Sequence, residues 1–436
     1  MTTRANTSLR RAGLVAAALT SLTALGTLAA TVPAVAGVSV SHVEQVALVD
    51  GTGEQLPYKS HLNGTADVLS YDGRFAVFST DAPLVPEDTN ETEDVYVHDR
   101  EVGTTTLVSV RRDGGLGNDY SHEPTISDDG RYVAFTTWAT NLATDRNGSH
   151  LDVLVKDLET GKLSRVSLTS GDRQLKPNSF FPVISGDGRS VAFQTFAALG
   201  ARDHDRTEDV YVRDLDTGTT RQASLQPDDH DIRGPLGVGD ISNDGAKVTF
   251  GNDHLLWVRN VATGRTIRVW QEPTPAPCQD WPDAGSVGRP SISGDGRFVA
   301  FSSCSTDLPG ENGDATDIYV IRLRDGEITR AHPKGNGHSY LPSLSRTGRF
   351  VGFGSDASNL VDGDDEGQPD AFVVDRRTGE VVRATQAVDG TGGASWNATN
   401  HVAISGDGQS LAFGSYSQNL VAGDAYDLEE AFVWHR

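Results

Sequence analysis

The sequence predicts an all-β fold, a seven-bladed β-propeller closed by an N-terminal strand that completes the last blade. Three observations support this prediction: a phrase that occurs seven times, four strand-like segments in each repeat, and chain ends that complement each other. The phrase has the form ISDDGRYVAF, and its marker glycines lie 51 to 60 residues apart, at Gly73, Gly130, Gly188, Gly245, Gly296, Gly348 and Gly408. A repeat of this length indicates one supersecondary unit stacked on copies of itself.

The second repeat shows the expected elements. Residues 124–127 form a short strand, residues 128–130 a turn whose glycine takes positive φ, and residues 131–135 a second strand. Residues 152–157 form the third strand, and residues 162–168 the fourth. The second and third strands are apolar on both faces, which is typical of a sheet packed between neighbouring sheets. Four-stranded sheets arranged radially are propeller blades, and a linear β-solenoid is the alternative.

The chain ends favour a ring over a solenoid. The seventh repeat stops at residues 431–434, its third strand, while residues 43–49 form a strand with no repeat of its own. We therefore expect this N-terminal strand to close the last blade. The tight DGR and TG turns then lie on one face of the ring, the tight-turn face. The longer second-to-third loops and the blade connections share the other face, the long-loop face, where binding residues are expected.

The first 36 residues have the features of a secretory signal peptide. A positively charged start precedes an apolar run over residues 12–31, and residues 34–36 offer an A-x-A cleavage site. We expect residues 37–436 to form one secreted domain, free or associated with the cell wall, with no stable membrane insertion after cleavage. The net charge of −23 makes nucleic acid an unsuitable partner.

Two cysteines in an exported chain suggest one disulfide. Cys278 precedes the fifth repeat and Cys304 follows its second strand. Both belong to the long-loop face at one blade boundary, so a bond between them is expected.

The repeat resembles that of the TolB-like (WD-type) propeller family over residues 43–436. In the first repeat the matching residues are Asp72, Gly73, Arg74, Phe78, Asp94, Tyr96, Asp99 and Gly103. The resemblance implies a propeller in an exported bacterial protein and no defined activity. The N-terminal α/β domain of TolB is not expected here. Prolyl-oligopeptidase-type enzymes also carry propellers, but no G-x-S-x-G nucleophile motif is present.

Oxygen-bearing side chains recur just before the third strands. Calcium prefers six to eight oxygen ligands, and Asp or Asn at alternate loop positions supplies several, so Ca²⁺ binding is one interpretation. Local Asx turns and hydrogen bonds that lock the blade are the other. The candidate residues are Asp88, Asn90 and Asp94; Asp145, Asn147 and Asp152; Asp203, Asp205 and Asp209; Asn312, Asp314 and Asp317; and Asp364, Glu366 and Asp370.

A second group of residues precedes the innermost strands, where the chain enters the channel mouth. Mixed aromatic, basic and acidic side chains at comparable positions suggest a ligand-binding surface or acid–base chemistry. These residues are His122, Glu123, Phe180, Phe181, Arg289, Tyr340 and His401, and an aromatic patch is suggested by Trp138, Trp281 and Trp396 on the same face.

From these observations we expect a monomeric, non-enzymatic propeller that requires no cofactor. It binds a protein, a peptide or a cell-wall glycan through its long-loop face. The alternative is a polysaccharide- or peptide-cleaving enzyme whose active site lies at the channel mouth.

Overall fold

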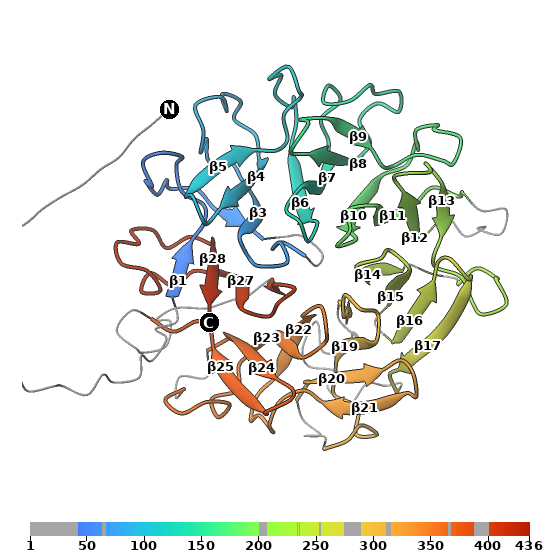
Figure 1. Cartoon of the computed structure of the whole chain (residues 1–436), viewed down its shortest axis with the longest axis vertical. Coiled ribbons are helices and arrows are strands. Elements are labelled where there is room, and N and C mark those ends of the chain that lie inside the picture. The colour runs from blue at the N-terminus through green and yellow to red at the C-terminus, as the bar shows by residue number, and fades with distance from the viewer. Residues whose placement is uncertain are drawn as a thin grey trace, which may run out of the picture. The chain divides into compact units, whose positions relative to one another are not determined.

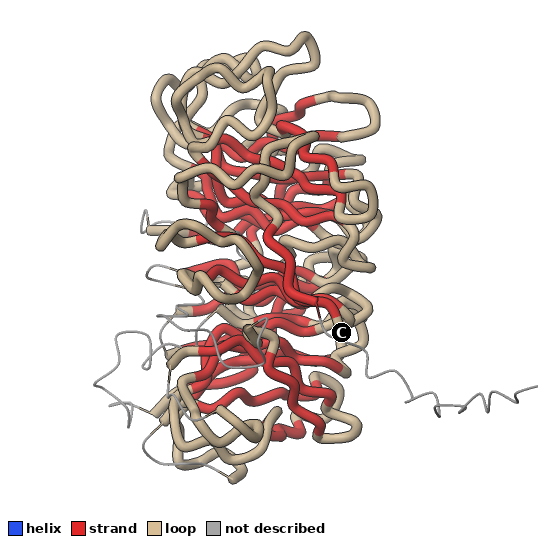
Figure 2. Tube along the Cα trace, turned by 90° about the vertical axis from the view of Figure 1, so that its left-hand side faces the viewer, coloured by secondary structure: helices blue, strands red, loops and turns tan. Residues whose placement is uncertain are grey.

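The computed structural model describes residues 42–62, 67–199, 207–232, 234, 236–252, 254–273, 289–310, 315–364, 368–387 and 401–436. Residues Ser41–Arg436 form one compact unit. Within the described residues the regular structure is entirely β-strand (Figure 2). No helix there is long and apolar enough to cross a membrane. The predicted signal peptide lies outside the described residues.

The strands form seven antiparallel four-stranded sheets around a central channel (Figure 1), which confirms the predicted propeller. Blade one contains β2 (Ser60–His61), β3 (Phe75–Thr80), β4 (Asp94–Asp99) and β5 (Thr104–Leu107). Blade two contains β6 (Ser121–Ile126), β7 (Tyr132–Thr137), β8 (Asp152–Asp157) and β9 (Leu163–Arg165). Blade three contains β10 (Ser179–Ile184), β11 (Ser190–Thr195), β12 (Asp209–Asp214) and β13 (Thr220–Gln222).

The remaining blades repeat this order. Blade four contains β14 (Gly237–Ile241), β15 (Lys247–Gly251), β16 (Leu255–Asn260) and β17 (Arg265–Gln271). Blade five contains β18 (Ser291–Ile292), β19 (Phe298–Ser303), β20 (Asp317–Arg322) and β21 (Glu327–Arg330). Blade six contains β22 (Ser339–Leu344), β23 (Phe350–Ser355), β24 (Asp370–Asp375) and β25 (Glu380–Arg383). Blade seven contains β26 (Val402–Ile404), β27 (Ser410–Ser415), β28 (Glu430–His435) and β1 (His42–Gln45).

The N-terminal strand closes the ring as predicted. β1 pairs antiparallel with β28, with Val43 opposite Trp434 and Gln45 opposite Phe432. The strand is shorter than the expected residues 43–49, because after Val46 donates to the carbonyl of Ala431 the chain turns away. The fourth strand of blade two is also shorter than expected, since pairing with β8 covers only Leu163–Arg165.

The core lies between neighbouring blades. In each blade, one phenylalanine of the second strand is completely buried there, because the blade packs both of its faces against other blades. These residues are Phe78, Phe135, Phe193, Phe250, Phe301, Phe353 and Phe413.

The recurring phrase builds the tight-turn face. In blade two the Ser127 hydroxyl donates to Asp129 at 2.6 Å and accepts from the Tyr132 amide at 3.0 Å. Gly130 has a φ of 72°, a conformation that favours glycine. Arg131 makes a two-bond pair with Asp157 at the end of the third strand, at 2.8 and 3.1 Å. The signature therefore links the first turn of a blade to its third strand.

Candidate functional site

Seven backbone hydrogen bonds join the first-to-second turns of all blades into a closed ring around the channel. Every bond is 2.9 Å long, and each links one blade to the next until blade seven returns to blade one. The amide-to-carbonyl pairs are Tyr71 to Asp128, Asp128 to Gly186, Asp187 to Asn243, Asn243 to Gly294, Asp295 to Arg346, Arg346 to Gly406, and Asp407 to Tyr71.

Side chains of the same turns close the channel at the tight-turn face. The Asp128 carboxylate of blade two accepts hydrogen bonds from Asn243 of blade four and from Arg346 of blade six, the latter at 3.2 Å. The Arg346 guanidinium also lies 5.3 Å from the ring centre of Tyr71 in blade one. Because these contacts join blades that are not neighbours, they cross the channel. We call Tyr71, Asp128, Asn243 and Arg346 the channel plug.

Glycines at the equivalent turn positions make room for the plug. A Cβ atom on Gly294 would lie 1.9 Å from Asn243 Oδ1, and one on Gly186 would lie 2.4 Å from Asn243 Nδ2. On Gly406 it would lie 2.4 Å from the ring of Tyr71. Small and large residues therefore alternate around the exit and fill it.

The innermost strands carry a bulge where they enter the channel from the long-loop face. The pairing register shifts at this point in β6, β10, β14 and β22. Three bulged residues have positive φ although they are not glycine: Glu123 at 55°, Phe181 at 49° and Leu341 at 51°. Such a conformation is strained for these residue types, and bulges commonly redirect side chains at functional sites.

Side chains at the mouth connect blades two, three, five and seven. Glu123 Oε2 accepts from the Phe181 amide at 3.0 Å, and its other oxygen lies 3.9 Å from His122 Nε2. The Arg289 guanidinium lies over the ring of Phe181, 5.4 Å from its centre. It also donates to Nε2 of His401 at 3.0 Å.

A small pocket of about 20 Å³ lies beside this chain of contacts. It is lined by Asp240, Arg289, Pro290, Ser291, Leu341, Pro342, Ser343, His401 and Val402. Burial, together with the charge of Arg289, lowers the pKa of His401 to about 3, so its ring is neutral at pH 7. Arg289 is therefore the positively charged group of the pocket. The neutral ring of His401 serves there as a hydrogen-bond partner only.

Asp240 is the acidic group of the pocket. Its carboxylate accepts from the Ile292 amide at 2.9 Å and from the Ser291 hydroxyl at 3.0 Å. Burial nevertheless raises the pKa of Asp240 to about 6. In blade one, burial and the charges of Asp240 and Asp128 raise the pKa of Asp67 well above its usual range. The channel between mouth and plug therefore holds acidic side chains that are readily protonated.

Because the pKa of Asp67 is raised, removal of this carboxyl group is expected to stabilise the protein in a pH-dependent way. Because the folded state binds this proton more tightly than the unfolded state, Asp67 lowers stability progressively as the pH rises from the unfolded pKa of about 4 to the raised folded pKa, so the loss is smaller at pH 5 than at pH 8. Asp67→Asn is expected to raise Tm at pH 8 by roughly 1–2 °C, about 1 kcal/mol, and to raise it by clearly less at pH 5. Thermal melts at both pH values, with the exposed Asp216→Asn as control, check this; an equal shift at both would contradict it.

The structure brings together most of the predicted mouth residues. His122, Glu123, Phe181, Arg289 and His401 are connected as described, and Phe180 packs on Phe181 and Phe196 with ring centres 5.2 and 5.8 Å apart. Of the other predicted residues, Tyr340 lies in β22 opposite Gly354, and Trp138 follows β7, where its amide donates to the carbonyl of Tyr120. Trp281 and Trp396 lie outside the described residues, so the aromatic patch stays a prediction.

Sequence reasoning missed Asp67, Asp240 and Leu341. Asp240 stands where the other repeats have Thr, Val, Ser or Ala, and Asp67 stands where Pro124 and Pro182 occur in blades two and three. A charged residue in an otherwise apolar or small inner-strand position was the available signal, because such a residue must face the channel rather than the core.

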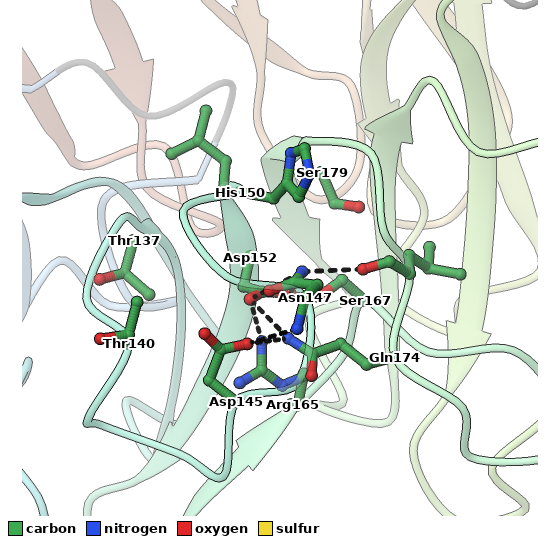
Figure 3. Close-up of polar contacts among 12 residues, drawn as sticks. Thr137, Thr140, Asp145, Asn147, His150, Asp152, Arg165, Ser167, Gln174 and Ser179 are labelled. Carbon is green, nitrogen blue, oxygen red and sulfur yellow. Dashed lines mark hydrogen bonds and ion pairs between the residues drawn. The ribbon is translucent and has the colours of Figure 1, made fainter.

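The acidic loop motifs on the long-loop face form hydrogen-bonded networks. In blade two (Figure 3), Asp152 accepts from Ser167 at 2.6 Å and from Gln174 at 3.0 Å, and it is ion-paired with Arg165. Gln174 also donates to Asp145 at 2.7 Å. In this blade the second interpretation, a hydrogen-bonded lock, describes what the structure shows.

The other acidic loops are described only in part. Asp203, Asp205, Asn312, Asp314 and Glu366 lie outside the described residues. Asp209 accepts from Ser224, and Asp370 accepts from Thr385. Among the described residues, no group of three or more His, Cys, Asp or Glu side chains is arranged to hold a metal ion. Cys304 is buried after β19, but Cys278 lies outside the described part, so the disulfide stays a prediction.

Comparison with known proteins supports the fold. No protein-family model and no curated protein sequence matches the chain. Among solved structures it is similar to an oligogalacturonate lyase from Vibrio parahaemolyticus, at 15% identity and TM-score 0.55, covering 91% of this chain and 96% of the lyase. It is also similar to the β-propeller domain of the trilobed protease from Pyrococcus furiosus, at 11% identity and TM-score 0.51, covering 86% and 93%.

TolB from Acinetobacter baumannii matches at 15% identity and TM-score 0.40, covering 84% of this chain and 81% of TolB. The likeness to the lyase and to the protease propeller supports the propeller fold alone. The Pyrococcus propeller is described as having an open velcro topology, whereas β1 closes the ring in this chain. These identities are too low to transfer an activity.

Proposed function

We propose that this protein is an exported β-propeller that binds a peptide or glycan chain in the long-loop mouth of its channel. The observation that carries the proposal is the pairing of a plugged exit with a polar, aromatic mouth. A ligand that enters from the long-loop face meets Arg289, His401 and Phe181 first and stops above the plug. Rigid scaffolds with concave, mixed polar and apolar sites are typical of ligand binding.

The chemistry of the mouth favours a ligand with a carboxylate next to an apolar or sugar face. A guanidinium binds carboxylates in a fork of two hydrogen bonds. Phe181 under Arg289 and the half-exposed Phe196 offer flat surfaces for stacking. Peptide termini and acidic cell-wall glycans both have these features, and each is an expected ligand class.

Binding to defined probes tests the proposal. We would titrate the mature protein with acidic oligosaccharides, with oligogalacturonate as one member, with soluble muropeptides, and with short peptides. At least one class is expected to bind, and Arg289→Gln and Phe180→Ala are each expected to weaken it tenfold or more. Arg297→Gln, at an exposed arginine of the tight-turn face outside the plug, is the matched control and leaves binding unchanged. Equal affinity in all variants would contradict the proposal.

A second candidate function is cleavage of the bound chain. It is favoured by Asp240, whose pKa of about 6 suits proton transfer near neutral pH and whose carboxylate lines the same pocket as Arg289. This candidate predicts released product from the same probes and its loss in Asp240→Asn with binding retained. Binding of a probe without release of product would contradict cleavage and support binding as the function.

The proposal also includes the export of the protein, its monomeric state and its disulfide bond. Removal of residues 1–36 during export would deliver the domain outside the cytoplasm, secreted or associated with the wall, as a monomer. An oxidising compartment would also support a Cys278–Cys304 bond. Its presence is measured as a mass increase of two protons on reduction.

A further inference from the structure

The acidic loops of blades two, five and six each contact an internal cation at the same position of the blade. It is an arginine from the fourth strand, at the position directly opposite the third residue of the third strand: Arg165 opposite Leu154, Arg330 opposite Tyr319, and Arg383 opposite Phe372. Arg165 pairs with Asp152, and Arg330 approaches Asp317 at 3.2 Å. Arg383 lies 3.5 Å from Asp364 and 3.8 Å from Asp370. In each blade a guanidinium balances the buried carboxylates.

Blade one keeps the carboxylates but not the cation. Leu107 stands opposite Tyr96, in the place of Arg165. The bridge of Val110 with Leu116 in blade one corresponds to the bridge of Leu168 with Gln174 in blade two. Leu116 therefore stands in the place of Gln174, whose side-chain amide donates to the acidic loop of blade two. Both changes remove hydrogen-bond donors from the surroundings of Asp88 and Asp94.

Three oxygen atoms of this loop are left buried without a hydrogen-bond partner: Asp88 Oδ1, Thr92 Oγ1 and Asp94 Oδ2. Asp94 is completely buried and Asp88 is 7% exposed. The other carboxylate oxygens have donors, because Ser109 donates to Asp94 and Tyr96 donates to Asp88. Asn90 also hydrogen-bonds to both residues, through its side chain to Asp94 and through its backbone amide to Asp88. Burying ionised oxygens without a partner is costly, so the loop as it stands lacks a positive charge.

We propose that blade one binds Ca²⁺ through Asp88, Thr92 and Asp94, where blades two, five and six hold an arginine. The available donors are all oxygens, two of them carboxylates, which is the ligand type of hard cations. Asn90 and backbone carbonyls of the loop can complete the shell, and Ca²⁺ accepts such irregular geometry more readily than Mg²⁺.

The internal repeat supplies its own test through a reciprocal swap. Metal-free protein would be titrated with CaCl₂ in a calorimeter, and its Tm measured with CaCl₂, with MgCl₂ and with EDTA. Wild type is expected to bind Ca²⁺ and to gain several degrees in Tm with Ca²⁺ over EDTA. Leu107→Arg, which places the guanidinium of blade two in blade one, is expected to bind one Ca²⁺ fewer per chain and to lose this gain.

Two further variants keep the test decisive. Asp94→Asn removes one ligand and is expected to weaken Ca²⁺ binding at least tenfold even if Leu107→Arg folds poorly. Arg165→Leu removes the arginine of blade two and is expected to make that blade responsive to Ca²⁺. Absence of any Ca²⁺ signal in metal-free wild type would overturn the proposal. So would an unchanged signal in both Leu107→Arg and Asp94→Asn, because the cation would then bind elsewhere.

Discussion

A chain that begins at Val49 is expected to be less stable than one that begins at Ser41 by about 4 kcal/mol or more, a large share of the 5–15 kcal/mol typical of a folded protein. The shorter chain loses β1 and with it the fully buried Val46, whose burial alone contributes about 1.5–3 kcal/mol. It also leaves β28 as an open edge, with Phe432 and Trp434 losing their cover.

Urea unfolding of the two chains measures this difference. A synthetic peptide of residues 37–50 is expected to restore part of the lost stability when added in trans, because it can pair with β28. Equal midpoints for the two chains would contradict ring closure by β1. A loss that the peptide does not reduce would assign the effect to something other than strand pairing.

Gly294→Ala is expected to destabilise the protein by about 1–3 kcal/mol, the usual cost of overpacking. The added Cβ would lie 1.9 Å from Asn243 Oδ1 and 3.0 Å from Cγ of Arg346, so the plug must move. Since the φ of Gly294 is not in the left-handed region, the cost comes from lack of space and not from backbone strain.

Asn243→Gly supplies the matched rescue. Glycine already stands at this turn position in blades three, five and seven, as Gly186, Gly294 and Gly406, so the turn tolerates it. The double variant Asn243→Gly/Gly294→Ala is expected to recover most of the stability lost by Gly294→Ala alone. Additive losses in this double-mutant cycle would mean that the two residues do not share the channel exit.

The fold was predictable because the repeat states it seven times. The marker glycines, the apolar second and third strands and the unpaired terminal strand each constrain the same ring. The ends of the outer strands were not predictable, because an edge strand such as β9 is limited by its pairing with β8 and not by its own apolar pattern.

The candidate site was predictable only where it follows the repeat. Arg289 and His401 stand at comparable distances from their marker glycines, so counting placed them at one rim. The plug was missed because Tyr71, Asp128 and Arg346 occupy the most variable position of a turn that otherwise serves folding. These residues contact one another between blades that are not neighbours, and such contacts cannot be predicted from a local sequence pattern.

The same limit explains the acidic loops. Five loops share a motif, but the residue that faces it from the fourth strand differs, being for example Arg165 in blade two, Leu107 in blade one and Gln222 in blade three. Only the strand register shows that these positions are equivalent.

Hydrogen–deuterium exchange of the protein with and without a bound probe tests the central claim most directly. Protection is expected at the entry of the innermost strands, in peptides that cover residues 289–292, 339–344 and 401–404. Peptides of the tight-turn face, such as residues 70–75 and 127–131, are expected to exchange at unchanged rates. Protection confined to the tight-turn face or to the outer strands would contradict a ligand held at the long-loop mouth of a plugged channel.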